Sequence, residues 1–387
     1  MHLSLVLGSL LAAVAPPVEA PSFQFPEGKV AAGAQLQYLG KVPVLTVEGT
    51  REEMGSAVGR LALKPGSRVL EYPRDLLVLR KVDYLWAYFK GAGKALYRNF
   101  PADARTELEA IARAAGVDRD LVICGNTFFD LKKVFACSAL LVEGSRSSTG
   151  GPLLARNLDY PSLGYIHEYS LVTVYRPRGK LAFASVGFPG LVGVLSGMNE
   201  AGLAVGVLEV FDAREGQSNF DRSGIPYGLC LRQVLEEART IPEACKVLER
   251  LKRTTTINVA IADRHTVGVL EVSPGKVVLR SSLDGMCVTT NHFCSGDLKA
   301  KKPANINKTF ERFAELERLR KVETRQSPDL LRQRLDAVNL GSLTLQTMVF
   351  EPQALRLHLA MGKVPSSALP LQTLDLTPLL RGKSDRR

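Results

Sequence analysis

The sequence predicts an α+β protein, in which a helical N-terminal part precedes a sandwich of strands and helices. Two observations lead to this fold class. Apolar residues recur at helical spacing over much of the first third of the chain, and short apolar β-type runs become frequent from Cys137 onward. Runs of strands and runs of helices within one chain are typical of α+β packing. With 387 residues, the chain can form two small domains or one large one.

Residues 21–136 are expected to be the helical part. A strand is predicted over residues 42–47, and Thr50 and Glu53 have the spacing of a capping box, which predicts the start of a helix. Helical spacing of apolar residues then extends from residue 72 to about residue 115.

Residues 137–365 are expected to form the larger part, which mixes strands and helices. Strands are predicted over 138–142, 153–158, 170–175, 181–186, 255–262, 266–272, 276–280 and 286–292, with hairpins over 192–210 and 344–361. Helices are predicted over 228–251, with a break at Pro242, and over 306–320 and 328–338. Residues 366–387 are rich in Pro, Ser and Arg, so a loosely ordered basic tail is expected.

Residues 1–20 resemble a secretory signal peptide. Residues 3–15 are apolar and have the length of a signal core, although the stretch before them carries no Lys or Arg. Small residues at Ala13 and Ala15, and at Val18 and Ala20, provide two candidate cleavage sites. An uncleaved anchor is the alternative, but the stretch is short for a bilayer span. We therefore expect an exported protein, periplasmic or extracellular.

The net charge of +11 does not by itself indicate nucleic-acid binding. Lys and Arg are scattered, the densest runs being residues 299–302 and 386–387, and no zinc-finger or RNA-binding aromatic motif accompanies them. A solvated basic surface, or attraction to an anionic substrate or membrane surface, is the favoured interpretation.

The six cysteines form no C-x-x-C pair, which argues against a structural zinc site. Cys230 and Cys245 lie in a helical stretch and are expected to pack as small apolar residues. Cys287 and Cys294 could bridge in an oxidising compartment, which the sequence alone does not decide. No metal cluster or phosphate-binding loop is present, so no metal or other cofactor is expected.

Cys137 is the strongest candidate nucleophile. It stands where the helical part gives way to the β part, and the small Ala136 before it would not hinder attack on the preceding carbonyl. Cleavage there would give Cys137 an α-amine, which titrates near about 7.7–8.0, close to a thiol at about 8.5. That amine could accept the thiol proton, so no histidine is needed as a base.

Arg156 and Asp159 are the candidate partners of Cys137. A guanidinium beside the sulfur would stabilise the thiolate, and a carboxylate could orient the α-ammonium. Strand residues three apart face opposite sides, however. Both side chains can reach Cys137 only if the strand ends or bulges near Asn157 or Leu158, and Pro161 makes an early end plausible.

These residues fall in motifs that resemble a known family. Cys-Ser-Ala-Leu-Leu-Val (137–142) and Gly-Gly-Pro-Leu-Leu-Ala-Arg-Asn-Leu-Asp-Tyr-Pro (150–161) resemble the N-terminal-nucleophile hydrolases of the penicillin acyltransferase-like group. That group is related to acid ceramidase, N-acylethanolamine acid amidase and the choloylglycine hydrolases. Four more segments match in order and spacing: 49–55, 196–203, 288–293 and 348–352.

The resemblance implies a four-layer αββα fold and a chain that cuts itself between Ala136 and Cys137. Cys137 would be the nucleophile and Arg156 and Asp159 its partners. Asn291 would donate to the oxyanion, and Asn199, which also suits an ordinary hairpin turn, is a weaker second donor. His292 follows Asn291 on a strand and is expected to be structural.

The expected activity is hydrolysis of a linear amide in a small N-acyl substrate through a thioester, with the two fragments of the precursor staying associated. An acyltransferase that uses the same thioester with an acceptor other than water is the main alternative. A papain-like protease would need a Cys–His pair, for instance with His167, and lacks its signature here. A non-catalytic exported binding protein remains the third reading. Contact with a membrane surface or lipid is compatible with the charge, and nucleic acid is not expected.

Overall fold

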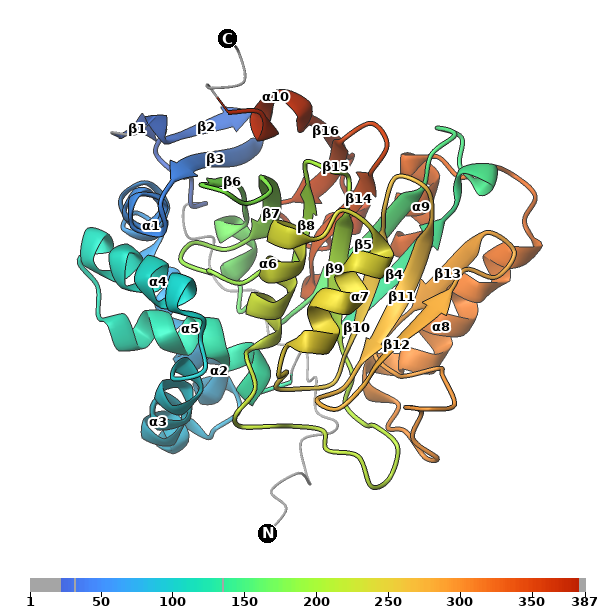
Figure 1. The fold of residues 1–387 in the computed structure, drawn as a ribbon, viewed down its shortest axis with the longest axis horizontal. Coiled ribbons are helices and arrows are strands. Elements are labelled where there is room, and N and C mark those ends of the chain that lie inside the picture. The colour runs from blue at the N-terminus through green and yellow to red at the C-terminus, as the bar shows by residue number, and fades with distance from the viewer. Residues whose placement is uncertain (1–21, 31–32, 134–135, 383–387) are drawn as a thin grey trace.

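Two sheets form the centre of the fold, and the larger one contains strands from both sides of Cys137 (Figure 1). The computed structural model describes residues 22–30, 33–133 and 136–382. The order of the larger sheet is β1-β2-β3-β6-β7-β8-β9-β10-β11-β12. Its strands are β1 (Gly28–Lys29), β2 (Gln35–Leu39), β3 (Val42–Gly49), β6 (Leu171–Pro177), β7 (Phe183–Gly187), β8 (Ser196–Asn199), β9 (Ala204–Glu209), β10 (Ile257–Ala262), β11 (Val267–Val272) and β12 (Val277–Ser281).

The smaller sheet has the order β13-β4-β5-β14-β15-β16, and each neighbouring pair is antiparallel. Its strands are β4 (Ala136–Val142), β5 (Leu153–Asp159), β13 (Met286–Thr289), β14 (Thr344–Glu351), β15 (Arg356–Met361) and β16 (Gln372–Asp375). Every residue of β4 and β5 is buried. Since both faces of these strands are covered, β4 is a nearly continuous apolar run, whereas β5 carries the buried polar residues Arg156, Asn157 and Asp159 after its first three apolar residues.

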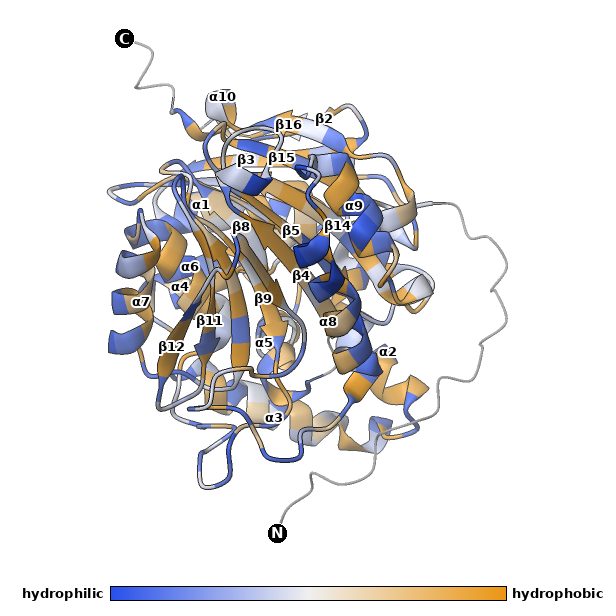
Figure 2. Ribbon diagram, turned by 90° about the vertical axis from the view of Figure 1, so that its right-hand side faces the viewer, coloured by the Kyte–Doolittle hydropathy of each residue, from blue (hydrophilic) through white to orange (hydrophobic). Residues whose placement is uncertain are grey.

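Helices cover the outer face of each sheet, which gives four layers. α1 (Arg51–Val58), α4 (Ala102–Ala115), α6 (Tyr227–Glu237) and α7 (Ile241–Arg250) lie on the side of the larger sheet, whereas α8 (Thr309–Glu317) and α9 (Pro328–Asp336) pack on β4, β5, β13 and β14. Between these layers β9 and β10 contact β4 and β5. Figure 2 shows α6 and α7 on one side of the strands and α8 and α9 on the other. The predicted αββα sandwich is confirmed.

The other helices lie at the edges of the sandwich. α2 (Tyr72–Leu79), α3 (Trp86–Tyr97) and α5 (Arg119–Leu131) contact one another beside α4, and α10 (Thr377–Leu380) contacts β6. Short helical turns join the elements: η2 (Gly59–Leu63), η3 (Ser67–Glu71), η4 (Asp83–Leu85), η5 (Gly144–Arg146), η6 (Ile166–Tyr169), η7 (Ile306–Lys308), η8 (Arg318–Lys321), η9 (Gly341–Leu343) and η10 (Ser366–Ala368).

Local sequence signals explain the helix ends nearest the predicted motifs. The Thr50 hydroxyl accepts from the Glu53 backbone N–H, and the Glu53 carboxylate accepts from the Thr50 N–H, so the predicted capping box begins α1. The predicted break at Pro242 separates α6 from α7. Pro242 lies in the first turn of α7, where the ring removes no intrahelical hydrogen bond, and Thr240 caps that helix.

The N-terminal part is less purely helical than the sequence predicts, because β1, β2 and β3 join the larger sheet. β3 pairs in parallel with β6, with Val44 opposite Val172 and Gly49 opposite Pro177. The strand predicted over residues 42–47 is confirmed, whereas β1 and β2 are short edge strands with little apolar signal. The pre-Cys137 part therefore belongs to the same core as the rest.

The prediction of a loosely ordered tail is wrong for residues 366–382. β16 adds to the edge of the smaller sheet and α10 follows it, with Leu374, Leu376 and Leu380 buried. Those three leucines supply the apolar anchor that the local Pro and Ser content obscured. The remaining tail residues, 383–387, and the predicted signal peptide lie outside the described residues, so export stays a prediction.

All six cysteines are unpaired, so the bridge considered between Cys287 and Cys294 is not formed. Within the described ranges, none of the helices has the length and apolar character needed to cross a membrane.

Candidate active site

Cys137 is the second residue of β4 and lies in the core between the two sheets. Its side chain is fully buried, and it pairs with Leu158 of β5. Arg156 stands two residues before Leu158, so strand alternation puts Arg156 on the same face as Cys137. Arg156 Nη2 donates a hydrogen bond to Cys137 Sγ over 3.1 Å. The fold thus brings these two predicted site residues into contact.

The guanidinium of Arg156 is held from the larger sheet. Its Nη1 donates to the Leu195 backbone oxygen and to Ser196 Oγ, both at 2.9 Å. Gly206 on β9 leaves room for it, because a Cβ there would lie 2.8 Å from Arg156 Cδ. Arg156 therefore extends from the smaller sheet, and contacts with the larger sheet hold its guanidinium beside the thiol.

Asp159 reaches Cys137 by a different route from the predicted one. The pairing of β5 with β4 continues regularly to Asp159, opposite Ala136, and the register irregularity lies on β14 between Thr344 and Gln346. The strand therefore neither ends nor bulges near Asn157 or Leu158, and the early end that Pro161 suggested is wrong. Since residues three apart on a regular strand face opposite sides, Asp159 lies beside the Ala136–Cys137 peptide bond rather than on the thiol face.

The carboxyl group of Asp159 is fully buried and only partly satisfied. Oδ1 accepts from Thr344 Oγ1 at 2.5 Å, and Oδ2 has no hydrogen-bond partner among the residues that the structure describes. Burial raises the pKa of Asp159 to about 6, against the lowering effects of Arg312, Thr344 and Arg156.

Asn291 lies just past β13 and holds the backbone nitrogen of Cys137. Its Oδ1 accepts from the Cys137 N–H at 3.0 Å and from Arg312 Nη2 at 2.8 Å. Its Nδ2 donates to the Glu209 backbone oxygen at 2.9 Å. The structure therefore places the predicted Asn291 at Cys137, where it contacts the main chain.

Asn199 is not part of this cluster, and the interpretation of Asn199 as a second oxyanion donor is corrected. Its Nδ2 donates to the Leu235 and Ala238 backbone oxygens, and its Oδ1 accepts from the Ala201 and Leu203 N–H groups. These bonds fasten the β8–β9 turn to the end of α6. The alternative, a hairpin-turn asparagine, accounts for this residue.

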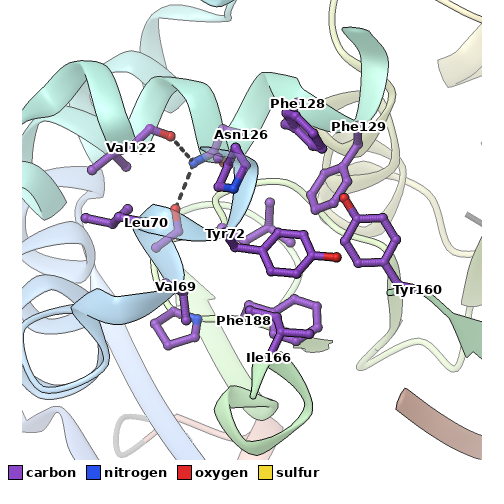
Figure 3. Close-up of a pocket in the computed structure, with 15 residues that line it drawn as sticks. Val69, Leu70, Tyr72, Val122, Asn126, Phe128, Phe129, Tyr160, Ile166 and Phe188 are labelled. Atoms are coloured by element: carbon purple, nitrogen blue, oxygen red, sulfur yellow. Dashed lines mark hydrogen bonds between the residues drawn. The ribbon is translucent and has the colours of Figure 1, made fainter. Parts of the chain in front are cut away.

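An apolar cavity of about 50 Å³, partly open to solvent, lies between elements from both sides of Cys137 (Figure 3). Its wall polar group, Asn126, is engaged: Nδ2 donates to the Val122 and Gly190 oxygens, and Oδ1 accepts from the Val192 N–H. Tyr160, which follows Asp159, forms part of the wall. The cavity is lined by Val69, Leu70, Tyr72, Pro73, Val122, Gly125, Asn126, Phe128, Phe129, Tyr160, Ile166, Phe188, Pro189, Gly190 and Leu191.

Residues 146–363, more than half of the 387-residue chain, match the acyl-coenzyme A:6-aminopenicillanic acid acyl-transferase family. The chain belongs to this family. The matched range begins after Cys137 and includes Arg156, Asp159 and Asn291. The predicted likeness to the penicillin acyltransferase group is thereby confirmed.

Curated relatives of this acyl-transferase family member are distant and longer. An uncharacterized protein of Archaeoglobus fulgidus is 29% identical over 49% of this chain and 36% of its own length. Protein dcd1B of Dictyostelium discoideum is 22% identical over 60% of this chain and 51% of its own length. The chain thus spans about a third to a half of these relatives. Among solved structures, a variant of conjugated bile acid hydrolase from Clostridium perfringens aligns with 17% identity and a TM-score of 0.45, covering 64% of this chain and 95% of that one.

Burial has the largest effect on the thiol of this acyl-transferase family member and raises the pKa of Cys137 to about 11. Arg156 and the Asp159 N–H lower the pKa, and the Asp159 and Glu209 carboxylates raise it. Arg156 therefore acts in the predicted direction, but desolvation of a fully buried thiolate outweighs one guanidinium.

Arg312 is a site residue that the sequence did not reveal. It extends from α8, and its Nη1 donates to the Cys137 backbone oxygen at 2.6 Å and to Ser138 Oγ at 2.7 Å. Together with its bond to Asn291, these contacts fix the main chain on both sides of Cys137. α8 is rich in charged residues, and nothing in its spacing distinguishes Arg312 from its exposed neighbours.

Glu209 was also missed, although the sequence carried a signal for it. It ends β9, in an otherwise apolar run, and its side chain is fully buried. Oε1 accepts from the Tyr227 hydroxyl at 3.2 Å. A single carboxylate in a strand that is otherwise apolar indicates a buried charge, and buried charges concentrate at functional sites.

Among the residues that the structure describes, no histidine makes a hydrogen bond to Cys137. His292 packs on Phe310 and Phe313, and its Nδ1 contacts the Thr290 and Thr309 hydroxyls, while burial lowers its pKa to about 4. The structural role predicted for His292 agrees with these contacts. His167 makes no hydrogen bond to Cys137 in the described part of the chain, so a papain-like Cys–His pair is not formed.

Proposed function

We propose that this chain is an amide hydrolase that cuts its own backbone between Ala136 and Cys137 and then uses Cys137 as an N-terminal nucleophile. One observation supports this above all others: both the thiol and the backbone nitrogen of Cys137 are held by polar side chains. Arg156 contacts the sulfur, and Asn291 contacts the nitrogen. A catalytic cysteine that does not use its own α-amine has no need for a side chain that holds its backbone nitrogen.

The partly satisfied carboxyl of Asp159 supports the same proposal. Asp159 pairs with Ala136, immediately before the proposed cut. Breaking the bond would turn the Cys137 N–H into an ammonium group next to that carboxylate. The ammonium would supply both a donor for Oδ2 and a positive charge that lowers the pKa of the neighbouring thiol.

The self-cleavage step begins when the Cys137 sulfur attacks the Ala136 carbonyl carbon. The C–N bond breaks, the nitrogen takes the thiol proton and becomes the α-amine, and Ala136 is left as a thioester on the sulfur. Water then hydrolyses the thioester, which gives the Ala136 carboxylate and restores the Cys137 thiol. Arg312, bonded to the Cys137 oxygen, and Asn291, bonded to the Cys137 nitrogen, would keep the main chain fixed during the transfer.

The catalytic cycle uses the same groups on an external amide. The α-amine accepts the thiol proton, the thiolate attacks the substrate carbonyl, and Asn291 donates to the oxyanion, a contact worth about 2.7–4 kcal/mol where a single such donor has been removed. The α-ammonium then protonates the leaving amine. Water, giving a proton back to the α-amine, releases the acid from the thioester.

The apolar cavity supports an acyl chain as the part of the substrate that is buried. It is lined almost wholly by apolar and aromatic side chains, and its polar wall group, Asn126, is already bonded within the protein. Tyr160 belongs to the cavity wall and also adjoins the site, because it directly follows Asp159, and burial and the charge of Glu209 both raise its pKa. We therefore propose an N-acyl amide with an aliphatic or aromatic acyl group.

A membrane or lipid surface is the proposed source of such substrates. Val78, Leu79, Tyr84 and Tyr88 on α2, η4 and α3 are 52%, 48%, 77% and 66% exposed, and Arg80 lies among them. Apolar side chains interspersed with basic ones suit an anionic lipid surface. α2 also contributes to the wall of the cavity.

Acyl transfer is the second candidate, and the family match supports it. The same thioester would react with an amine or thiol acceptor in place of water. Adding a nucleophilic amine to the assay separates the two activities. A transferase would give the new amide as its main product at millimolar acceptor, and a hydrolase would still give mainly the acid.

Intact-mass analysis of the purified chain tests the proposal. We expect two fragments from the parent, the second beginning at Cys137, and one uncut chain from Cys137→Ala. Cys230→Ala is the matched control, because Cys230 is equally buried and makes its hydrogen bond to the Ile225 backbone oxygen. It should be cut like the parent. A parent that stays full-length and resists iodoacetamide would refute self-processing and favour a non-catalytic binding protein.

A further inference from the structure

One face of α5 fastens the N-terminal part to the rest of the chain immediately before the proposed cut. Asn126 and Asp130 are spaced i and i+4 on α5, which places their side chains on one side of the helix. Lys133 lies two residues beyond Leu131, the last residue of α5, and it continues the attachment in the chain that follows the helix. Each of the three binds a partner that follows Cys137 in the sequence.

Asn126 and Asp130 each bind segments that follow Cys137 in the sequence. Asn126 donates to the Gly190 oxygen at 2.8 Å and accepts from the Val192 N–H at 2.7 Å. Asp130 accepts from the Tyr227 N–H at 3.1 Å and also from the Thr254 hydroxyl. They hold α5 against the rest of the chain along its last turns.

Lys133 makes the contact nearest to Cys137. Its Nζ donates to the Val210 backbone oxygen and to Thr256 Oγ1, at the ends of β9 and β10. The carboxylates of Glu209, Asp212 and Asp130 surround the ammonium and raise its pKa, although burial is the larger effect and lowers the pKa to about 8. Glu209 belongs to the cluster at Cys137, so Lys133 is attached to the edge of the site itself.

The distance from Lys133 to the proposed cut is short. Three residues of extended chain span at most about 11 Å, so anchoring Lys133 restricts where the Ala136 carbonyl can lie. A displacement of 1 Å between reacting groups can cost about a hundredfold in rate. The anchor therefore bears directly on how well the Ala136 carbonyl is presented to the thiol.

We propose that Lys133 is a positioning residue for self-cleavage: its bonds to Val210 and Thr256 hold the Ala136 carbonyl at the Cys137 thiol. This inference rests on the proposed self-cleavage. Lys133 touches neither reacting atom.

The test uses mass spectrometry to measure the rate at which freshly refolded chain is cut, in the parent and in a set of variants. Lys133→Met should be slower than the parent by roughly tenfold to a hundredfold. Lys133→Arg, which keeps the charge and the donors, should recover much of the loss. Lys132→Met is the matched control: this neighbouring lysine is also half-buried, its side chain makes no hydrogen bond in the described structure, and the variant should be cut at the parent rate.

A substitution of Thr256, the acceptor in the hydrogen bond from Lys133, tests the same contact. Thr256→Val removes the hydroxyl acceptor in an isosteric way and should slow cutting even if Lys133→Met fails to fold. In the double variant the two effects should add up to less than their sum, because both remove the bond between Lys133 and Thr256, although each also removes a bond to the Val210 oxygen.

The outcomes separate this inference from the proposed function. A parent that is never cut removes both. A parent that is cut, with Lys133→Met or Thr256→Val cut equally fast, removes only the positioning role. A loss that Lys133→Arg does not rescue, together with a similar loss in Lys132→Met, would also overturn it, because the effect would then be a general disturbance of the segment.

Discussion

Replacing Asp159 by Asn should make the uncut chain less sensitive to pH. The Asp159 carboxyl is fully buried, and burial raises its pKa from 3.8 to about 6, even though Arg312, Thr344 and Arg156 oppose the shift. The charged form of this carboxyl group is thus destabilised in the folded chain. Asn has nearly the same shape and carries no charge at any pH.

The magnitude follows from the shift. A change of about 2 pKa units corresponds to about 3 kcal/mol. Because the folded chain binds this proton more tightly than the unfolded chain does, the stabilising contribution is complete below pH 3.8 and is lost as the pH rises through 6. Between pH 4 and pH 7, Asp159 should therefore remove about 2 kcal/mol from the free energy of unfolding.

Urea unfolding at both pH values, in a Cys137→Ala background that prevents cutting, provides the measurement. The decrease in the free energy of unfolding from pH 4 to pH 7 should be about 2 kcal/mol smaller with Asp159→Asn. Asp130, whose pKa is raised to about 7 by burial, contributes equally to both proteins and cancels. Asp103→Asn is the control, because the Asp103 side chain is 64% exposed, and it should leave the pH dependence unchanged.

Equal pH dependence with and without Asp159 would refute the reasoning, since it would mean that the carboxyl is already paired or solvated in the precursor. With Cys137 present, Asp159→Asn should also slow self-cleavage, because the new ammonium would lose its carboxylate. A variant that is cut as fast as the parent would remove Asp159 from the mechanism and leave the stability argument intact.

Three further substitutions probe the site and its support. Gly206→Ala should slow self-cleavage by about tenfold, because the new Cβ would lie 2.8 Å from Arg156 Cδ and displace the guanidinium; an unchanged rate by mass spectrometry would show that Arg156 can move without loss. Asn199→Ala should lower the free energy of unfolding in urea by about 2–3 kcal/mol, through its lost turn bonds, while the chain is still cut; an uncut product would restore a catalytic role. Arg232→Met should cost about 3–5 kcal/mol, measured the same way, because it leaves Glu107 buried without its nearest cation; a loss below 1 kcal/mol would contradict this.

Local signals in the sequence predicted the parts of the fold that depend on neighbouring residues. Thr50 and Glu53 predicted the start of α1, and Pro242 predicted the boundary before α7. The contact between Cys137 and Arg156 could also be expected, because two adjacent antiparallel strands joined by a short loop bring such residues to one face. These inferences need only spacing and strand alternation.

The rest of the site depends on long-range packing, which spacing does not encode. Arg312 approaches Cys137 from a helix 175 positions further along the chain and looks like any other basic helix residue. Asn199 and Asn291 both stand at or just past the end of a strand, and only the fold shows that one is fixed to the end of α6 and the other to Cys137. The raised pKa of the Cys137 thiol likewise follows from burial, which the sequence around it does not quantify.

The parallel pairing of β3 with β6 means that the Ala136–Cys137 linkage contributes little to cohesion. Strand β3 is flanked on one side by β2, from its own part of the chain, and on the other by β6, from beyond Cys137. Two fragments expressed separately, one ending at Ala136 and the other starting at Cys137, should therefore associate and form the same sheet through the pairing of β3 with β6.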